Sequence, residues 1–403
     1  MTEHSPLGGS GAYRWMPCPG SVALSHGVPD EKSEYATLGV AAHKLGEHCL
    51  LENEDAWRMV GEAVYEGEIV PPGPSVEDLP YPERAISIDK SMADAVQVYL
   101  NAVRSTHPSF ELGFNAWVEQ EFHAPEIHKL CWGKVDFAFL DVAKRTLDVW
   151  DYKHGAGIVV EVIVNPQLMY YGCGILDELN LWEEVDLVNL HVAQPRGFHH
   201  DGPIRSWSIS TDDLWDWMND TLVLAMDRAM ASRDTTSGEH CRFCPARARA
   251  CPQLAKDFDE LEEMLKMFDE KDAAPKLTHA QVGRFLDLLD VAKIAGKAAG
   301  KIGFGYAMAG EDVPGRKLVK QRANREWKPE AEAELKERFG GKAYTEPELK
   351  SPSQIEGFSG GEKMTARHAF KPDKGLTLAR DDDVRMAVKK DVRAMFQNKE
   401  GKK

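Results

Sequence analysis

The chain has 403 residues, of which 43% are hydrophobic and 28% charged, the make-up of a folded globular protein. No apolar run is long enough to cross a bilayer, and the N-terminus lacks the charged-then-apolar order of a signal peptide, so a cytoplasmic location without a membrane partner is expected. The net charge of -16 argues at first sight against nucleic acid. However, residues 281–403 contain 26 Lys and Arg against 19 Asp and Glu, and this basic excess could approach a phosphate backbone.

The length favours two domains, and the hydrophobic periodicity predicts that the first is an α/β domain. Residues 66–84 are rich in Pro and Glu and are expected to form a loop, and residues 158–165 a short strand or loop. Three strands are predicted to be antiparallel, the last two joined by a turn at 142–145. The expected helices are residues 35–51, 86–107, 166–179 and 211–232, and the expected strands are residues 116–122, 133–141, 146–153 and 185–195.

The break at residues 269–277 is the predicted domain boundary. It separates domain 1–268 from an α+β appendage at 269–403, which contains a long helix at 279–309 and a hairpin near 313–327. The appendage is expected to contact DNA or a protein partner.

Two carboxylates lie on strands that the short turn makes neighbours. Asp136 is in "GKVDFAF" and Asp151 in "VWDYK", and such a pair repels unless a divalent cation lies between its members. Mg²⁺ or Mn²⁺ suits these oxygen ligands, and Lys153, on the same face as Asp151, could orient a water or stabilise phosphate charge. The alternative is a salt-bridged Asp–Lys pair on a solvated face, which a short D-x-K pattern favours by itself.

Two helices carry further polar candidates. His43 lies among small and apolar residues, where it is either a hydrogen-bonded core histidine or a metal ligand projecting into the carboxylate site. Gln167 and Tyr171 are four residues apart and therefore share a helix face, from which they could contact nucleic acid or support the metal. The alternative for this pair is a half-buried polar face.

The cysteines point to a second inorganic site. Cys241, Cys244 and Cys251 follow the spacing C-x₂-C-x₆-C, and Cys18, far upstream, is the natural fourth ligand. Four thiolates suit either Zn²⁺ or an iron–sulfur cluster, and spacing does not decide between them.

The order of these pieces resembles that of the PD-(D/E)XK nuclease superfamily in its RecB-like branch. The resemblance covers residues 13–252 and implies a restriction-endonuclease-like core, a mixed central sheet flanked by helices. It implies that Lys153 is the catalytic lysine beside the catalytic Asp136 and Asp151. One departure is Val135, where the superfamily's name has proline. The implied metal ligands are His43, Asp136, Asp151 and the backbone carbonyl of Tyr152.

One more acidic residue is expected on the preceding strand. We assign Glu121 to the catalytic set, although Glu119 shares its face and the choice between the two stays open.

A cysteine before the nuclease motifs and three after them resembles the iron–sulfur nucleases, such as the AddB-type helicase-nucleases and the CRISPR-associated adaptation nucleases. This implies a structural [4Fe–4S] cluster, with Zn²⁺ as the alternative, that staples the two ends of the nuclease domain.

The whole chain also resembles phage and prophage proteins that are built on this core. They are thought to act as exonucleases in recombination inside the bacterial host cell, often beside a single-strand annealing protein. Related nucleases form ring-shaped homo-oligomers.

The sequence therefore predicts a metal-dependent deoxyribonuclease. Two other classes stay open: a non-catalytic nucleic-acid-binding or assembly protein that keeps the nuclease fold, and a zinc-stabilised adaptor in which the acidic site is incidental.

Overall fold

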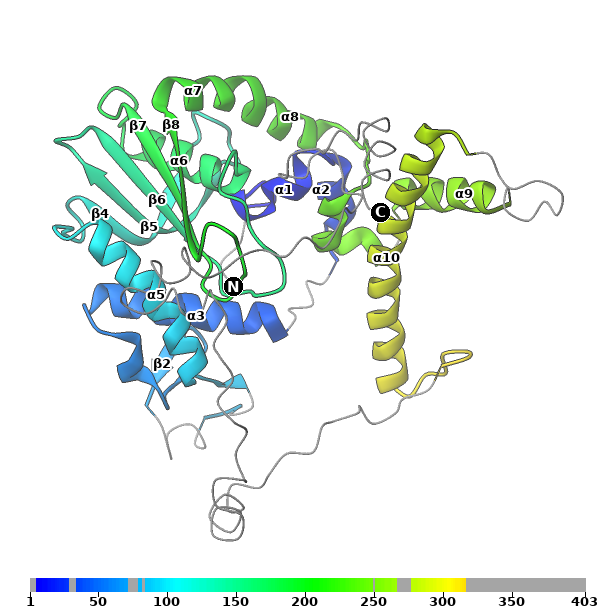
Figure 1. Ribbon diagram of the computed structural model, residues 1–403, viewed down its shortest axis with the longest axis horizontal. Coiled ribbons are helices and arrows are strands. Elements are labelled where there is room, and N and C mark those ends of the chain that lie inside the picture. The colour runs from blue at the N-terminus through cyan, green and yellow to red at the C-terminus, as the bar shows by residue number, and fades with distance from the viewer. Residues whose placement is uncertain are drawn as a thin grey trace, which may run out of the picture. The chain divides into compact units, whose positions relative to one another are not determined.

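The computed structural model describes residues 5–28, 34–71, 79–81, 84–248, 251–266 and 277–316. Its centre is a five-stranded sheet with the strand order β4-β5-β6-β7-β8 (Figure 1). A smaller, three-stranded sheet has the order β2-β1-β3. The strands are β1 (Ala63–Tyr65), β2 (Glu68–Val70), β3 (Ile86–Ser87), β4 (Ala116–His123), β5 (Trp132–Asp141), β6 (Thr146–Tyr152), β7 (Leu187–Ala193) and β8 (Ile204–Ser210).

The large sheet is mixed. β4, β5 and β6 pair antiparallel, which confirms the prediction for these three strands. β6 and β7 are parallel and are connected through α6 (Pro166–Glu178), and β8 returns antiparallel to β7. The fold is therefore α/β with a mixed sheet flanked by helices, as expected, and the finer assignment to a restriction-endonuclease-like core stays a prediction.

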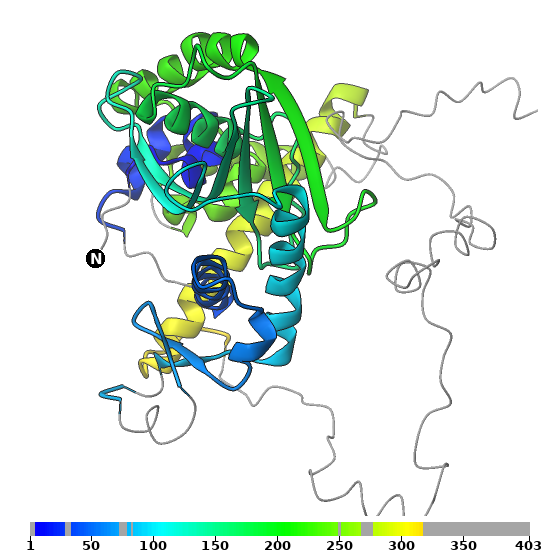
Figure 2. The same ribbon diagram turned by 90° about the vertical axis from the view of Figure 1, so that its left-hand side faces the viewer.

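Two apolar clusters cover the two faces of this sheet. On one face α3 (Glu34–Leu51) and α5 (Lys90–Thr106) pack against Phe137 and Trp150. In Figure 2 α3 is seen almost end-on, and α5 runs beside it. On the other face α6 packs against Val149 and Leu190, together with the helical segment at 211–231. Because both faces are covered, β6 and β7 are buried along most of their length.

Local signals explain where several helices begin. Asp89 caps α5 by accepting a hydrogen bond from the Met92 amide at 2.7 Å, so this helix begins later than residue 86, which instead belongs to β3. Asn165 caps α6, with Pro166 in the first turn, as predicted. Residues 153–165 contain no strand, which settles that choice in favour of a loop. The loop expected at 66–84 was partly wrong, because residues 68–70 form β2.

The remaining helices precede β4 or follow β8 in the chain. The predicted helix at 211–232 is one helical run with a π-helical turn at Met218–Val223. The predicted long helix is confirmed as α10. The other helices are α1 (Ala12–Trp15), α2 (Gly20–Ser25), α7 (Thr211–Trp217), α8 (Leu224–Ala231), α9 (Pro252–Lys266) and α10 (His279–Met308), with 3-10 turns at Gly9–Gly11, Ala56–Met59, Glu239–Phe243 and Pro245–Ala248.

The helix α10 packs on α9. Arg284 donates hydrogen bonds to Asp257 at 3.0 Å and to Glu260. The first compact unit of the chain correspondingly runs from Met1 to Leu318 and includes α10, although we expected the first domain to end at residue 268. The predicted hairpin near 313–327 and the rest of the appendage lie almost wholly outside the described residues. None of the described helices is long and apolar enough to cross a membrane.

Candidate metal and catalytic site

The central sheet is irregular where the acidic residues lie. Glu119 and Asp136 stand opposite each other, and the regular pairing of β4 with β5 skips both. The ladder between β5 and β6 also stops at Phe137 and Trp150, one residue short of Asp136. Glu119 adopts a left-handed backbone with φ 48°, a conformation that costs an L-residue about 1–2 kcal/mol.

The side-chain pattern of β5 reverses between Val135 and Phe137, and we call this irregular part of the sheet the step. Phe137 joins the cluster under α3 and α5, whereas Val135, two residues away, joins the opposite cluster beside Phe122. In a regular strand residues two apart share a face. The step therefore turns the strand over, and it leaves the carboxylates of Glu119 and Asp136 between the two apolar clusters.

Three donor groups meet at this step. His43 Nδ1, from α3, lies 3.4 Å from Asp136 Oδ1 and 3.9 Å from Glu119 Oε1. One ligand atom from each of these three residues lies within 4.8 Å of the other two. An imidazole with two carboxylates suits a divalent cation such as Mn²⁺ or Mg²⁺. These residues fit the predicted metal.

The second oxygen of Asp136 connects two strands. Oδ2 accepts a hydrogen bond from the Tyr152 amide at 2.7 Å. This bond takes the place of the β5–β6 ladder, which ends at Phe137 and Trp150. Burial alone would raise the pKa of Asp136, but His43 and this amide bring it below its ordinary value. The carboxylate is therefore ionised and fixed in position. The predicted role of the Tyr152 carbonyl as a ligand stays a prediction.

The same carboxylates also change the pKa of His43. Burial disfavours the imidazolium, but the carboxylates of Asp136 and Glu119 outweigh it and raise the pKa of His43 to about 10. In the absence of a metal, a proton therefore takes up part of the negative charge of this site.

Asp151 is the centre of the adjoining network. Its side chain is buried and accepts hydrogen bonds from Lys153 Nζ at 3.0 Å and Gln167 Nε2 at 3.0 Å. Gln167 also accepts from Lys153 at 3.0 Å and donates to the Tyr171 hydroxyl at 2.9 Å. Burial, aided by the Asp136 charge, raises the pKa of Asp151 despite Lys153. The structure thus brings together the four residues of the D-x-K and Q-x-x-x-Y motifs.

The structure favours Glu119 over Glu121 as the further acidic residue. Glu121 is exposed, whereas Glu119 is half-buried and forms ion pairs with His43 and Lys134. Strict alternation puts residues 119 and 121 on one face, so the sequence could not separate them. The left-handed backbone at Glu119 makes the difference, and our assignment of Glu121 is corrected accordingly.

Tyr99 on α5 is a member of this site that the sequence did not reveal. Its buried hydroxyl has no hydrogen-bond partner among the described residues, and its ring lies 5.2 Å from that of Tyr152. Burial, followed by the charges of Asp136 and Glu119, raises its pKa well above the ordinary value, so the hydroxyl stays protonated. A buried hydroxyl that has no hydrogen-bond partner among the described residues, beside carboxylates, fits a site that binds a further polar group.

Arg196 lies at the other side of the D-x-K motif. Its Nη1 donates to His154 Nε2 at 2.7 Å, and the second nitrogen of His154 bonds the Tyr152 hydroxyl at 2.9 Å. Burial and the Arg196 charge lower the pKa of His154 to about 4, so this histidine is neutral. Among the ion pairs of the described residues, none neutralises Arg196.

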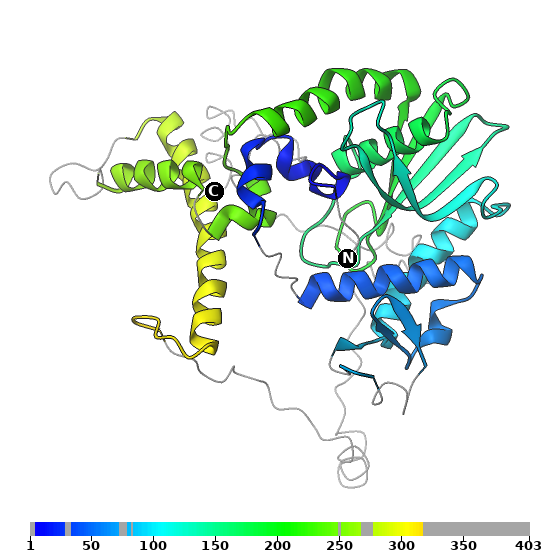
Figure 3. The same ribbon diagram turned by 180° about the vertical axis from the view of Figure 1, so that it is seen from behind.

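The two cysteine-bearing segments lie side by side. α1 and α2 pack against the turns at Glu239–Phe243 and Pro245–Ala248, as Figure 3 shows. The Thr236 amide donates to Cys18 Sγ at 3.5 Å, and the Gly20 amide donates to the Asp234 carbonyl at 2.8 Å. A Cβ at Gly20 would come within 2.5 Å of the Arg233 carbonyl oxygen, so only glycine permits this approach.

The thiols fit a shared inorganic group. Cys18, Cys241 and Cys244 are buried and Cys251 is half-buried, all as free thiols. No three of these sulfur atoms lie within 4.8 Å of one another in the part of the chain that the structure describes, and the [4Fe–4S] cluster, with Zn²⁺ as the alternative, stays a prediction. Arg14, bonded to Ser21 at 3.0 Å, supplies positive charge beside Cys244 and Cys18.

Comparison with known proteins supplies a family but no function. The family model "Protein of unknown function (DUF2800)" matches residues 4–391. The chain belongs to DUF2800. No solved structure matches it. The match covers nearly the whole chain, so both the acidic site and the cysteine segments of this protein lie within the matched range, and its function has to be argued from its own residues.

Proposed function

We propose that this DUF2800 protein is a Mg²⁺- or Mn²⁺-dependent deoxyribonuclease. One observation carries the proposal: His43, Glu119 and Asp136 present three metal-ligand atoms within 4.8 Å, beside the network of Asp151 and Lys153. A core salt bridge would need only one cation and one carboxylate. Three carboxylates, a histidine and a lysine around one break in a sheet form a donor set for a cation and a phosphate.

Each residue of the acidic site has a separate role in this proposal. His43, Glu119 and Asp136 would hold the metal, with Asp151 completing the site from β6. When bound, a divalent cation supplies positive charge to the phosphate and lowers the pKa of a bound water. Lys153 is held by Asp151 and Gln167, so its ammonium is oriented before substrate arrives and can exchange one of these contacts for a phosphate oxygen or the attacking water.

Arg196 is the proposed contact to the DNA backbone. Its neutral partner, His154, fixes the side chain by a hydrogen bond without cancelling its charge. Arginine in this state can form two parallel hydrogen bonds to a phosphate. The net charge of -16 is therefore compatible with DNA binding, because the local charge at the site matters more than the total.

A [4Fe–4S] cluster on Cys18, Cys241, Cys244 and Cys251 is the proposed structural cofactor. Close packing of the segments around residues 17–20 and 233–236 supports it, because a cluster here would fasten the N-terminal helices to the end of the domain. Purified protein should be brown and absorb near ~400 nm, whereas a colourless protein with bound zinc would support the adaptor hypothesis. Exonuclease action in phage recombination beside an annealing protein remains a prediction.

The test compares Asp151→Asn and Lys153→Gln with Glu121→Gln, which removes one exposed carboxylate of the same sheet. End-labelled linear DNA and closed circular DNA are incubated with each protein and Mg²⁺ or Mn²⁺. We expect the parent and Glu121→Gln to digest linear DNA, and the two site variants to lose at least about 100-fold in rate. Equal digestion by the site variants, or no digestion by the parent with either metal, would overturn the proposal.

A further inference from the structure

Exposed apolar side chains lie beside the acidic site, in the two loops that follow β6 and β7. The first loop, residues 153–165, begins at Lys153 and leads to Gln167, and both residues belong to the site. Four aliphatic side chains of this loop are between 38% and 64% exposed. In the second loop Phe198 is 80% exposed, two residues after Arg196. We call these five side chains the apolar rim: Ile158, Val159, Ile163, Val164 and Phe198.

The two loops are bonded to each other. Gln194 follows β7, is buried, accepts a hydrogen bond from the Val160 amide at 3.0 Å and donates one to the Ile158 carbonyl at 2.7 Å. Arg205 on β8 donates to the Val160 carbonyl at 2.9 Å. The Gly197 amide donates to the Gln194 carbonyl at 3.3 Å, so the same residue also holds the second loop. The rim residues of both loops are therefore held in one surface.

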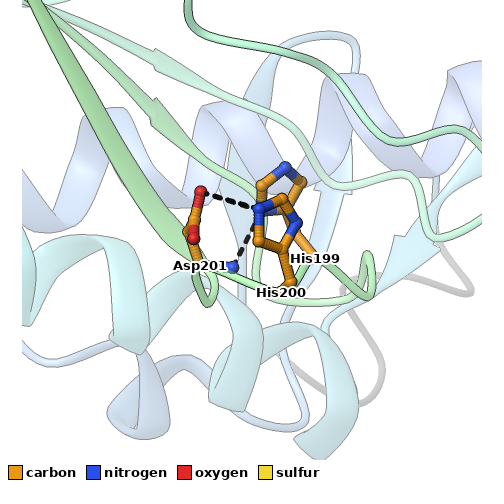
Figure 4. Close-up of side chains that lie close together, drawn as sticks. All are labelled: His199, His200 and Asp201. Atoms are coloured by element: carbon orange, nitrogen blue, oxygen red, sulfur yellow. Dashed lines mark hydrogen bonds and ion pairs between the residues drawn. The ribbon is translucent and has the colours of Figure 1, made fainter. Parts of the chain in front are cut away.

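The turn that carries Phe198 is ordered by its neighbours. His199 accepts a hydrogen bond from the Asp201 amide at 3.0 Å and stacks on His200, with ring centroids 4.3 Å apart (Figure 4). The other ring nitrogen of His199 lies 3.4 Å from Glu161 Oε2, in the first loop. The backbone next to Phe198 is thus fixed while its ring stays exposed. A ring presented in this way loses little conformational entropy when a partner binds to it.

Val164 is exposed in a backbone conformation that does not suit it. Its φ is 51°, in the left-handed region that β-branched residues rarely adopt. The next residue, Asn165, caps α6 and donates from Nδ2 to the Glu161 carbonyl at 2.6 Å, and these bonds keep the strained conformation in place. Glycine or asparagine would be more stable here. Local stability therefore does not explain a valine that is 57% exposed, whereas contact with an apolar ligand would explain it.

The charge beside the rim narrows the choice of ligand. Arg196 is exposed, and no ion pair in the part of the chain that the structure describes neutralises it. The carboxylate of the first loop, Glu161, faces His199. A ligand that contacts both Arg196 and the rim therefore has an anionic group next to an apolar face. Unpaired nucleotides meet both conditions, whereas the bases of a duplex are stacked and hide their faces.

We propose that the apolar rim binds the unpaired bases of a DNA strand, with the Phe198 ring stacked on one base and the aliphatic rim residues against its neighbours. This inference rests on the proposed nuclease function and adds a strand preference to it. The nucleotides next to the scissile phosphate would be single-stranded when bound. Every base has a flat face, so the rim should accept any sequence.

The experiment measures binding separately from cleavage. Ca²⁺ replaces Mg²⁺, and fluorescence anisotropy follows binding of the full chain to a single-stranded oligonucleotide, to the same strand in a blunt duplex, and to the same strand with abasic sites. We expect Phe198→Ala to weaken single-strand binding about 5–100-fold and to leave duplex binding unchanged. Phe114→Ala, which removes a 72% exposed ring before β4, should change neither. The abasic strand should bind the parent weakly and should be insensitive to Phe198→Ala.

Val164→Asn is the second probe, because asparagine tolerates the left-handed backbone and the variant should fold at least as stably as the parent. It should nevertheless weaken single-strand binding. Equal effects of Phe198→Ala and Phe114→Ala, equal losses for single strand and duplex, or tight binding of the abasic strand would overturn the inference. A changed oligomeric state of Phe198→Ala in light scattering would also overturn it, since a second copy would then cover the rim.

The cleavage assay on the parent keeps the two proposals apart. A parent that cleaves DNA while the rim variants bind normally leaves the nuclease proposal standing and refutes the rim. A parent that binds single strands through the rim but cleaves no DNA refutes the nuclease proposal alone.

Discussion

The left-handed backbone at Glu119 leads to a prediction that compares glycine with alanine. Both Glu119→Gly and Glu119→Ala remove the carboxylate and its ion pairs with Lys134 and His43. They differ in the cost of φ 48°, which is about 1–2 kcal/mol for alanine and close to zero for glycine. Part of this gain is lost because glycine has more freedom in the unfolded chain. We expect Glu119→Gly to be about 1 kcal/mol more stable than Glu119→Ala.

Glu121 supplies the matched control, because it lies on the same strand and its φ is not in the left-handed region. There glycine should be less stable than alanine by about 0.5–1 kcal/mol. The assay is equilibrium urea unfolding of all four variants, followed by fluorescence of the tryptophans. If Glu119→Ala equals or exceeds Glu119→Gly in stability, the backbone does not turn over at this residue, and our account of how the acidic site opens is refuted. Both variants at 119 should also lose DNA cleavage, and both at 121 should keep it.

Three further predictions concern other parts of the chain. Arg196→Gln should raise the KM for linear DNA about 10-fold with little change in kcat. Arg228→Gln, which removes an exposed cation from α8, should leave both constants unchanged. Equal effects of the two variants would count against a local phosphate contact. His107 is buried and accepts the Trp150 indole proton, and burial lowers its pKa to about 4. The unfolded chain therefore binds more protons than the folded chain below about pH 6.5, so the free energy of unfolding falls by up to about 3 kcal/mol as the pH drops from 6.5 to 4. Urea unfolding of His107→Gln should show a smaller fall over this pH range. The same pH dependence in parent and variant would contradict this. Cys18→Ser should lower iron per chain and absorbance near ~400 nm, and retention of both would remove Cys18 from the proposed cluster.

Much of the fold could be predicted because its signals are local. The alternating pattern of β5 and β6 and their short turn gave a hairpin, and Asn165 with Pro166 marked the start of α6. The small sheet could not be predicted in this way. β2 has three residues, none of them fully buried, within a segment rich in Pro and Glu, so its pattern is too short to stand out although its pairing with β1 is local. The pairing of β3 with β1 joins residues more distant in sequence.

The acidic site was partly predictable for the same reason. His43, Asp136, Asp151 and Lys153 stand in motifs of recognisable order, and the structure brings them together. Tyr99 and Arg196 belong to no motif. They reach the site from α5 and from the β7–β8 connection, so only the packing of these elements against β6 reveals them.

The irregular step in the sheet links this geometry to the proposed chemistry. A regular sheet would continue the β4–β5 ladder through Glu119 and Asp136, and the β5–β6 ladder through Asp136 and Asp151. Because the β5–β6 ladder ends at Phe137, the Tyr152 amide is released to bind the Asp136 carboxylate, and His43 approaches the other oxygen. Backbone strain of this kind persists only where surrounding contacts enforce it, and it is concentrated at functional sites. The strained residue and the proposed cation ligand are here the same glutamate, so relieving the strain by Glu119→Gly should also abolish metal binding.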